Sequence, residues 1–501
     1  MKALQKLLWG GVGAAAGYSA WYKLQERREI QSYAGLARNK TIVILGSGFG
    51  GMAVAEELAR LLPDPGNGEI VLIDYKNYLL FTPMLTEAAG GELDTGHITS
   101  PVRRLPKRIR FVQGEVTGID LASKTVTVKR GSDSVGASEE LYRADHLVIA
   151  LGSVSNFHHE ESVAKYALQM KSLEDAGEVC RRVLACLESA SLERDEAKRK
   201  EYLTFVVGGA GYTGVETMAA INDLARDGVR DHSNLQPEDV RAVLVDPADR
   251  LLPELTSDLA EYAARKLKER QVELLLKTSV TGAGEDYVEL NGNQRLPSRT
   301  LIWAAGVEPN PLVKALDCPK GKHGGVETNN CCQVTKYNGV WALGDCAEVP
   351  RPDGKGAYAP TAQNATREGS LVGQNIARSL RGFPPKRFTY TPIGELALVG
   401  KRSGVARIYN KNFSGLLAWA MWRAVYLAKM PSMSQRIRIV GDWTLDWIFG
   451  REPIPISPGW ASNAGAPSIE TLPKPKRERS PGSGTRRTRK AESHPRSRPS
   501  Q

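Results

Sequence analysis

The stretch that decides the fold is Thr41-Ile-Val-Ile-Leu-Gly-Ser-Gly-Phe-Gly-Gly-Met-Ala-Val-Ala-Glu-Glu-Leu-Ala59. Its five leading residues are apolar or β-branched, which predicts a strand buried on both faces of a parallel sheet. A GxGxxG pattern follows, and after it come apolar residues at helical spacing. We expect Gly46 to permit the tight turn, Gly48 to let the backbone approach a pyrophosphate, and Gly51 to allow close helix–strand packing.

A second strand, residues 70–73, ends in Asp74, at the distance expected for an acid that binds the ribose hydroxyls. The free N–H groups of the helix N-terminus suit the phosphates. Strand, glycines, helix, strand and acid in this order predict a dinucleotide site. Its candidate residues are Gly46, Gly48, Phe49, Gly50, Gly51 and Asp74.

The same pattern returns after the apolar run at 203–207, with Gly209, Gly211 and Gly214 followed by Glu216 in the predicted helix. The next strand ends in Asp246. An acid there binds the adenine ribose diol and repels a 2′-phosphate, which favours NADH over NADPH.

Strands alternating with helices predict a doubly wound α/β protein with two Rossmann-like domains. We expect the first domain to comprise residues 37–164 and 301–399, and the second, residues 165–300, to be inserted in it. Two nested dinucleotide sites place two cofactors face to face, and hydride transfer between NADH and FAD uses that geometry. Gly344-Asp345, at the end of a third strand, then suits the ribityl chain of FAD better than it suits a plain turn.

The chain resembles the type II NADH:quinone oxidoreductases (alternative NADH dehydrogenases) from Thr41 to about Arg451. The resemblance rests on the two fingerprints and on these further stretches: Phe81–Leu85, Lys171–Ala176, Ala304–Gly306, Leu343–Ala347, Ala362–Ala365 and a Trp-rich end. It implies a non-proton-pumping enzyme that passes electrons from NADH through FAD to a membrane quinone.

The resemblance also implies roles for single residues. Glu216 would lie near the nicotinamide–flavin contact and handle protons, although an ordinary carboxylate on a helix surface is the alternative. Gln363 would lie by the flavin and the quinone. Pro83, Gly306 and Ala362 join the expected cofactor contacts. The chain departs from the family's Ala-Gln-x-Ala-x-Gln at Arg367, which puts the quinone contacts partly in doubt.

Residues 400–452 form a separate C-terminal segment in which four of the nine tryptophans fall between 419 and 447. In residues 416–430 the aromatic residues Trp419, Trp422 and Tyr426 share a predicted helical face with Arg423. We expect this segment and the aromatic residues 443–449 to lie in the headgroup region of a membrane, as amphipathic helices do. A core or dimer-interface helix is the alternative, and the sequence leaves a homodimer open.

The net charge of +11 is concentrated at the C-terminal end, because residues 470–501 hold ten Lys/Arg and three Glu and so carry +7. This location argues against nucleic acid as a partner. We expect residues 453–501 to be a disordered basic tail. Residues 1–36 resemble an uncleaved membrane anchor or the apolar core of a signal peptide.

The six cysteines show neither a disulfide framework nor metal spacing, which predicts free thiols and no metal site. Since the chemistry needs NADH, we expect the protein on the cytoplasmic face of the cell membrane, or on the matrix face of the inner mitochondrial membrane in a eukaryote.

Three other functions fit the fold. A sulfide:quinone oxidoreductase needs redox cysteines at the flavin, and no second cysteine matches Cys346. A disulfide reductase needs a cysteine pair after the first fingerprint, but the first cysteine is Cys180. A non-catalytic NADH-sensing flavoprotein is opposed by the two intact fingerprints.

Overall fold

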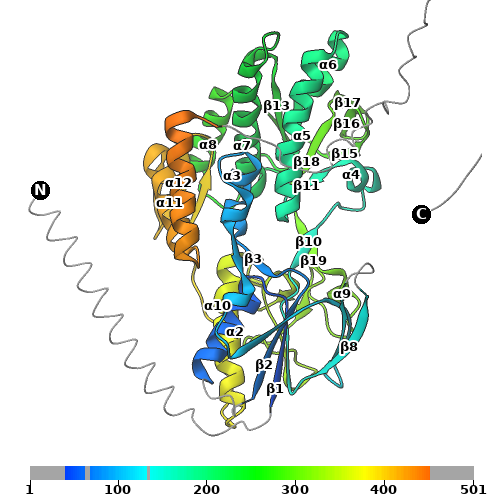
Figure 1. Ribbon diagram of the computed structural model, residues 1–501, viewed down its shortest axis with the longest axis vertical. Helices are drawn as coiled ribbons and strands as arrows, with labels where there is room; N and C mark the ends of the chain where they lie inside the picture. The colour runs from blue at the N-terminus through cyan, green and yellow to red at the C-terminus, as the bar shows by residue number, and fades with distance from the viewer. Residues whose placement is uncertain (1–39, 63–67, 132–135, 452–501) are drawn as a thin grey trace, which may run out of the picture. The chain divides into compact units, whose positions relative to one another are not determined.

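The computed structural model describes residues 40–62, 68–131 and 136–451. The predicted N-terminal extension and basic tail lie outside these residues. The described chain forms two parallel sheets and a C-terminal region (Figure 1). Their outlines agree with the predicted pair of Rossmann-like domains.

The first sheet is parallel throughout and has the strand order β21-β9-β1-β2-β5. Its strands are β1 (Thr41–Leu45), β2 (Glu69–Asp74), β5 (Ile109–Gln113), β9 (His146–Ile149) and β21 (Val340–Ala342). Helices α2 (Phe49–Leu61) and α10 (Ala362–Ser379) pack on one face, against Ile42 and Ile44 of β1. The other face, with Val43 and Leu45, packs against an antiparallel sheet made of β6 (Glu115–Asp120), β7 (Thr125–Arg130) and β8 (Ser138–Arg143). Burial on both faces explains the continuous apolar run in β1.

The second sheet is also parallel, in the order β11-β18-β12-β13-β14. Its strands are β11 (Leu168–Gln169), β12 (Thr204–Gly208), β13 (Arg241–Asp246), β14 (Val272–Leu276) and β18 (Thr300–Trp303). Its helices are α4 (Glu161–Tyr166), α5 (Leu173–Leu192), α6 (Glu196–Leu203), α7 (Tyr212–Gly228) and α8 (Ser257–Glu269). A small antiparallel sheet accompanies them: β15 (Val280–Ala283), β16 (Tyr287–Leu290) and β17 (Gln294–Pro297).

The predicted domain boundary at residue 301 falls inside β18, which pairs with β12 of the second sheet. The exchange between the domains comes later, where β10 (Ser153–Ser155) pairs with β19 (Val307–Pro309). The chain therefore passes into the second domain and back to the first through one antiparallel strand pair. The boundary predicted from the motifs, residue 301, lies a few residues before β19.

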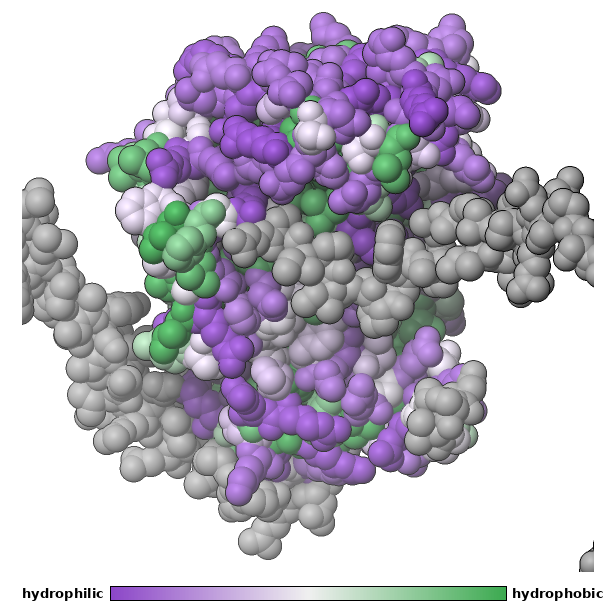
Figure 2. Space-filling view, turned by 45° about the horizontal axis from the view of Figure 1, so that its top comes forward, coloured by the Kyte–Doolittle hydropathy of each residue, from purple (hydrophilic) through white to green (hydrophobic). Residues whose placement is uncertain are grey.

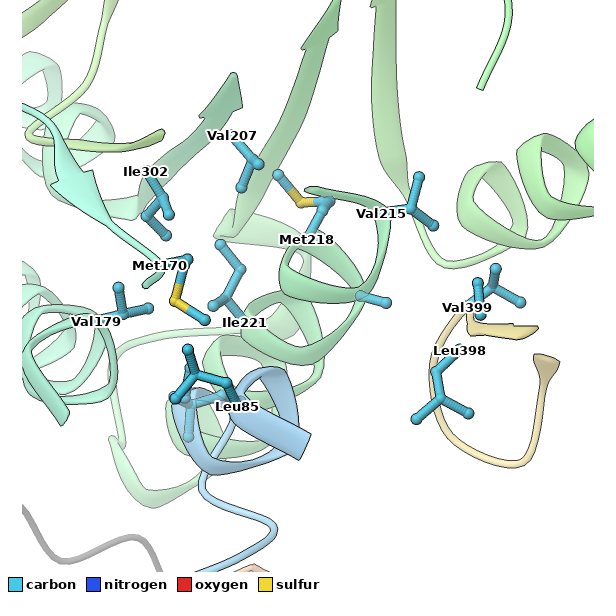
Figure 3. Close-up of a cluster of buried hydrophobic side chains, with 14 of the residues drawn as sticks. Leu85, Met170, Val179, Val207, Val215, Met218, Ile221, Ile302, Leu398 and Val399 are labelled. Carbon is cyan, nitrogen blue, oxygen red and sulfur yellow. The ribbon is translucent and has the colours of Figure 1, made fainter. Parts of the chain in front are cut away.

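A short excursion of the first domain carries β3 (Tyr78–Leu80), β4 (Thr99–Pro101) and helix α3 (Leu85–Ala89). Helix α3 contacts α5 and α7 of the second domain. Figure 3 shows Leu85 of α3 near Met170 and Ile221, in the cluster that also includes Met218 of α7 and Leu398. Helix α7 is thus surrounded by all three regions of the chain.

The C-terminal region begins with an antiparallel sheet, β23 (Gly394–Leu398), β24 (Gly404–Ile408) and β25 (Lys411–Ser414). The predicted start at residue 400 falls in the turn between β23 and β24. Helices α11 (Gly415–Lys429) and α12 (Met433–Phe449) follow. Among the described residues, no helix has both the length and the apolar character needed to cross a membrane.

Candidate active site

The first glycine loop joins β1 to α2 with the predicted geometry. Gly46 has a φ of +97°, and a Cβ there would collide with the carbonyl of Ala150. A Cβ on Gly51 would collide with Gly46 O, so the helix can approach the strand this closely only because residue 51 is a glycine. A Cβ on Gly48, at the N-cap of α2, would meet no atom within 4 Å. The space over Gly48 and the helix N-terminus fits a pyrophosphate.

The second loop joins β12 to α7 and repeats this geometry. Gly209 has a φ of +107°, and a Cβ on Gly214 would collide with Gly209 O. Gly211, at the N-cap of α7, again has no atom within 4 Å of an added Cβ. Both loops are therefore shaped for a dinucleotide phosphate.

The two acids hold their loops in the same way. Asp74 accepts hydrogen bonds from Ser47 N (2.5 Å) and Lys76 N (2.8 Å). Asp246 accepts from Ala210 N (2.5 Å) and Ala248 N (2.7 Å). Each acid is thus bound to its glycine loop through one backbone N–H group, that of Ser47 or of Ala210, which is a structural role besides the predicted ribose binding.

The predicted ribityl ligand Asp345 lies in a small polar network. Ser153 Oγ donates to Asp345 Oδ2 at 2.7 Å, and Lys171 Nζ donates to Ser153 Oγ at 2.8 Å. Burial lowers the pKa of Lys171, although Asp345 opposes that shift. Neither Ser153 nor Lys171 was among the predicted site residues. The only sequence signal for Lys171 is its place at the start of the family stretch Lys171–Ala176.

Gly344, with a φ of +67°, is fixed by a carboxylate of α10. Glu368 Oε2 accepts from Gly344 N at 2.8 Å, and burial raises the pKa of Glu368 to about 7. Glu368 was also missed, because a Glu in the middle of a polar helix gives no sequence signal.

Gln363 and Ala362 lie in the first turn of α10, where Thr361 Oγ1 accepts from Asn364 N at 3.2 Å. Gln363 Oε1 accepts from the Tyr390 hydroxyl at 2.6 Å. The Arg367 guanidinium lies over the Tyr390 ring, 4.3 Å from its centroid. Arg367 therefore acts on Gln363 through Tyr390.

An aromatic row leads from the first glycine loop to the C-terminal helices. Phe49 contacts Phe81 edge-on at 5.9 Å between ring centroids, and Phe81 contacts Tyr426 at 6.2 Å. Pro83 follows Phe81 in a short 3-10 turn, Thr82–Met84. Gly306, with a φ of +116°, follows β18, away from this row in sequence.

Glu216 lies on α7 and faces the C-terminal region. Its Oε1 accepts from Leu398 N at 2.9 Å and from Trp422 Nε1 at 3.0 Å. Burial raises its pKa to about 8, while these two donors act in the opposite direction. The alternative of an ordinary surface carboxylate does not fit a group with these partners.

Trp422 lies in the core with 0% exposure, so it does not face a membrane as predicted. Trp443 donates to Glu87 Oε2 at 3.3 Å, and the Arg423 guanidinium lies 4.3 Å from the ring centroid of Trp419. Trp447 alone of the four is exposed, at 70%. The indole N–H groups of Trp422 and Trp443 donate to the carboxylates of Glu216 and Glu87 instead.

All six cysteines are free, and Cys186, Cys331, Cys332 and Cys346 are buried. Cys346, which follows Asp345, is buried, and burial raises the pKa of its thiol to about 12. A thiol in that state is a poor nucleophile.

The fold and the two loops define a flavoprotein class that uses two dinucleotides. A family described as "Pyridine nucleotide-disulphide oxidoreductase" matches residues 40–369, and "NDH2 C-terminal domain" matches residues 393–452. The latter match begins near β23.

Relatives and solved structures agree with these matches. A "Probable NADH dehydrogenase" from Dictyostelium discoideum is 31% identical, with 83% of this chain and 91% of that protein covered. "Type II NADH:quinone oxidoreductase Ndh" from Mycobacterium tuberculosis is 30% identical, with coverages of 83% and 89%. The structure of NDH2 from Plasmodium falciparum in complex with NADH shares the fold, with a TM-score of 0.75, 20% identity and coverages of 83% and 99%.

The chain belongs to the type II NADH:quinone oxidoreductase family. FAD and NADH are the cofactors of this class, and the two glycine loops fit them.

Proposed function

We propose that this chain is a non-proton-pumping NADH:quinone oxidoreductase. The observation that carries the proposal is the pair of matching glycine loops, one in each parallel sheet, with Glu216 held between the second loop and the C-terminal region. When bound, FAD supplies the chemistry: it accepts hydride from NADH and passes two electrons on.

The residues divide between the two cofactors. Gly209, Gly211, Gly214 and Asp246 hold NADH, and the Asp246 carboxylate disfavours a 2′-phosphate. The FAD site comprises the first glycine loop with Phe49 and Gly50, together with Asp74, Pro83, Gly306, Gly344, Asp345 and Ala362. Lys171 belongs with this set because it contacts Asp345 through Ser153.

We assign quinone reduction to the region beside β23, where Gln363 and Glu216 both contact the strand. Gln363 Nε2 contacts the Gly394 carbonyl at 3.5 Å, so its amide is anchored mainly by Tyr390. In this chain Arg367 stacks on Tyr390, and Tyr390 in turn holds Gln363 in position for the acceptor. Glu216, with a pKa near 8, is protonated at neutral pH and can hold the proton that quinone reduction consumes.

Membrane binding is assigned to α11 and α12. Large apolar side chains are exposed along both helices: Leu416, Leu417, Met433, Ile437, Val440, Leu445, Trp447, Ile448 and Phe449. Apolar residues gather on the left flank in Figure 2, the side on which Figure 1 shows both helices. Such a face suits insertion into the headgroup boundary, on the side of the membrane where NADH is present.

The first experiment is an anaerobic titration of the purified chain with NADH, followed by a short-chain quinone, while the flavin absorbance is recorded. We expect bleaching by NADH and recovery with quinone. Bleaching without recovery would assign another acceptor. No bleaching by NADH would reject the enzyme in favour of a sensing flavoprotein, and bleaching by sulfide would assign the sulfide enzyme.

Membrane binding is tested by flotation with liposomes of the protein that carries Ile437→Ser, Trp447→Ser and Phe449→Ser. We expect release from liposomes with NADH-dependent bleaching retained. Exposed Leu141→Ser and Leu192→Ser, in the nucleotide domains, are the matched control. Removal of residues 413–450 is unsuitable because Ala418, Trp422 and Ile439 are core residues. Unchanged flotation of the triple variant would contradict the assignment to α12.

A further inference from the structure

A cavity of about 800 Å³ lies beside α7, between α3, the β23–β24 turn, α11 and α12. Glu216 lines it, as do Glu87 of α3 and Trp443 of α12. The cavity follows α7 from Glu216 past Ala219 and Ala220 to Asp223, away from the glycine loop. It is separate from the aromatic row that leads to the first glycine loop.

Each element around the cavity contributes charged groups to a lining that is otherwise largely apolar. The groups are Glu92 after α3, Asp223 on α7, Lys401 and Arg402 in the β23–β24 turn, Arg423 on α11 and Asp446 on α12. Arg423 Nε and Asp446 Oδ1 are buried without a hydrogen-bond partner in the described part of the chain. Buried polar atoms of this kind are satisfied by water, and the volume is ample for several molecules.

Glu87 differs in its partners from two other carboxylates of this cavity, Glu92 and Asp223, whereas Asp446 also has a single arginine, Arg451 at 3.7 Å. Glu92 contacts both Arg423 (3.0 Å) and Arg451, and Asp223 contacts both Arg270 and Arg451 (3.8 Å). Each of those two acids therefore has two arginine partners.

Glu87 is 2% exposed and faces one arginine, Arg423 at 3.1 Å, together with the Trp443 indole. Burial and the neighbouring Glu92 raise the pKa of Glu87, against the effect of Arg423. Glu87, with its pKa raised to about 8, can therefore change its protonation near neutral pH.

Reduction of a quinone by NADH consumes one proton from water: NADH + H⁺ + Q → NAD⁺ + QH₂. The two partners of Glu216 are the Leu398 amide and the Trp422 indole, and neither N–H group gives up its proton near neutral pH, so the proton of Glu216 has to come from another group or from water. We propose that the cavity is the inlet for this proton, and that Glu87 relays it through water to Glu216. The inference rests on the proposed function.

The test uses the full chain with FAD, and it follows the two half-reactions separately by stopped-flow absorbance from pH 6 to pH 9. In Glu87→Gln we expect the quinone step to slow by about tenfold or more at alkaline pH, with a larger solvent isotope effect. Reduction by NADH should stay unchanged. Infrared spectra near pH 7 should lose a protonated carboxyl band in the same variant, which is a readout apart from turnover.

Glu92→Gln is the matched control, because Glu92 shares the Arg423 partner with Glu87. If both variants change the pH profile equally, Glu87 only holds Arg423 and the relay is rejected. A second variant, Thr444→Trp, narrows the cavity from an exposed position on α12 and should slow the same step. An unchanged quinone step in both Glu87→Gln and Thr444→Trp would overturn the inlet.

Failure of the proposed function would be distinct from these results, since the wild-type protein itself would then not be reoxidised by quinone.

Discussion

The two dinucleotide regions share a loop but differ in what their helices face. Counted from the first glycine of each loop, Ala53 on α2 occupies the position that Glu216 occupies on α7. The Ala53 side chain lies against α10, because a Cβ on Gly369 would be 2.9 Å from Ala53 Cβ. Glu216 instead faces Trp422 and the cavity.

In α2 this position serves tight helix packing, and in α7 it carries a carboxyl group whose pKa is raised by burial. The loop geometry defines where a dinucleotide binds, whereas the next turn of the helix decides what chemistry surrounds it. The same substitution in the two loops should consequently have different effects.

The largest effect is expected from Gly51→Ala and Gly214→Ala. Each added Cβ would collide with the carbonyl of the first glycine in its own loop. Gly51→Ala should yield protein without bound flavin. Gly214→Ala should keep its flavin but lose bleaching by NADH. The measurements are the flavin-to-protein absorbance ratio and an anaerobic NADH titration. Equal flavin loss in both variants would show that the loops do not bind different cofactors.

The two acids offer a milder comparison. Asp246→Ala should weaken NADH binding by about tenfold or more, since it removes two backbone hydrogen bonds as well as the ribose contact. Selectivity against NADPH should fall in the same variant. The ratio of kcat/KM for the two nucleotides measures this effect, with Asp74→Ala as the control that should leave the ratio unchanged. An unaltered ratio in Asp246→Ala would reject the role of Asp246.

The position of Glu216 predicts a pH effect on stability. Its folded pKa, about 8, is above the ordinary value of 4.5, so the native state binds the proton more tightly than the unfolded state. This contribution is fully present below pH 4.5 and is lost as the pH rises through about 8. In Glu216→Gln the Tm should therefore fall less between pH 5 and pH 8 than in the wild-type protein. Thermal unfolding at several pH values checks this, and parallel curves would contradict the assigned pKa.

The smallest effect is expected from Trp422→Phe. Loss of the indole N–H removes one donor to Glu216 Oε1, worth about 1 kcal/mol, and so raises the pKa of Glu216 further. The pH midpoint of the quinone step should move upward by about 0.7. Trp419→Phe is the control, because Trp419 is not a hydrogen-bond donor to Glu216. A downward movement would show that the indole acts on this carboxyl by packing alone.

The two nucleotide loops could be predicted from local sequence, because strand, glycines and acid are close together in the chain and the first and last glycine of each loop are required by a close backbone contact. The roles of Trp422 and Trp443 could not be read in this way. Aromatic residues at helical spacing suit both a membrane surface and a buried contact, and their partners Glu216 and Glu87 are more than 200 residues earlier in the chain. The domain boundary near residue 301 was missed for a related reason, since β18 pairs with a strand about 100 residues away.

Arg451 has a consequence for limited proteolysis. Its side chain is 1% exposed and donates to Gly90 O at 3.1 Å, besides its contacts with Glu92 and Asp223. Trypsin cleaves after an accessible, extended arginine, so the peptide bond after Arg451 should resist cleavage in the native protein. The Arg451 side chain joins the end of α12 to Glu92, which follows α3, and to Asp223 of α7.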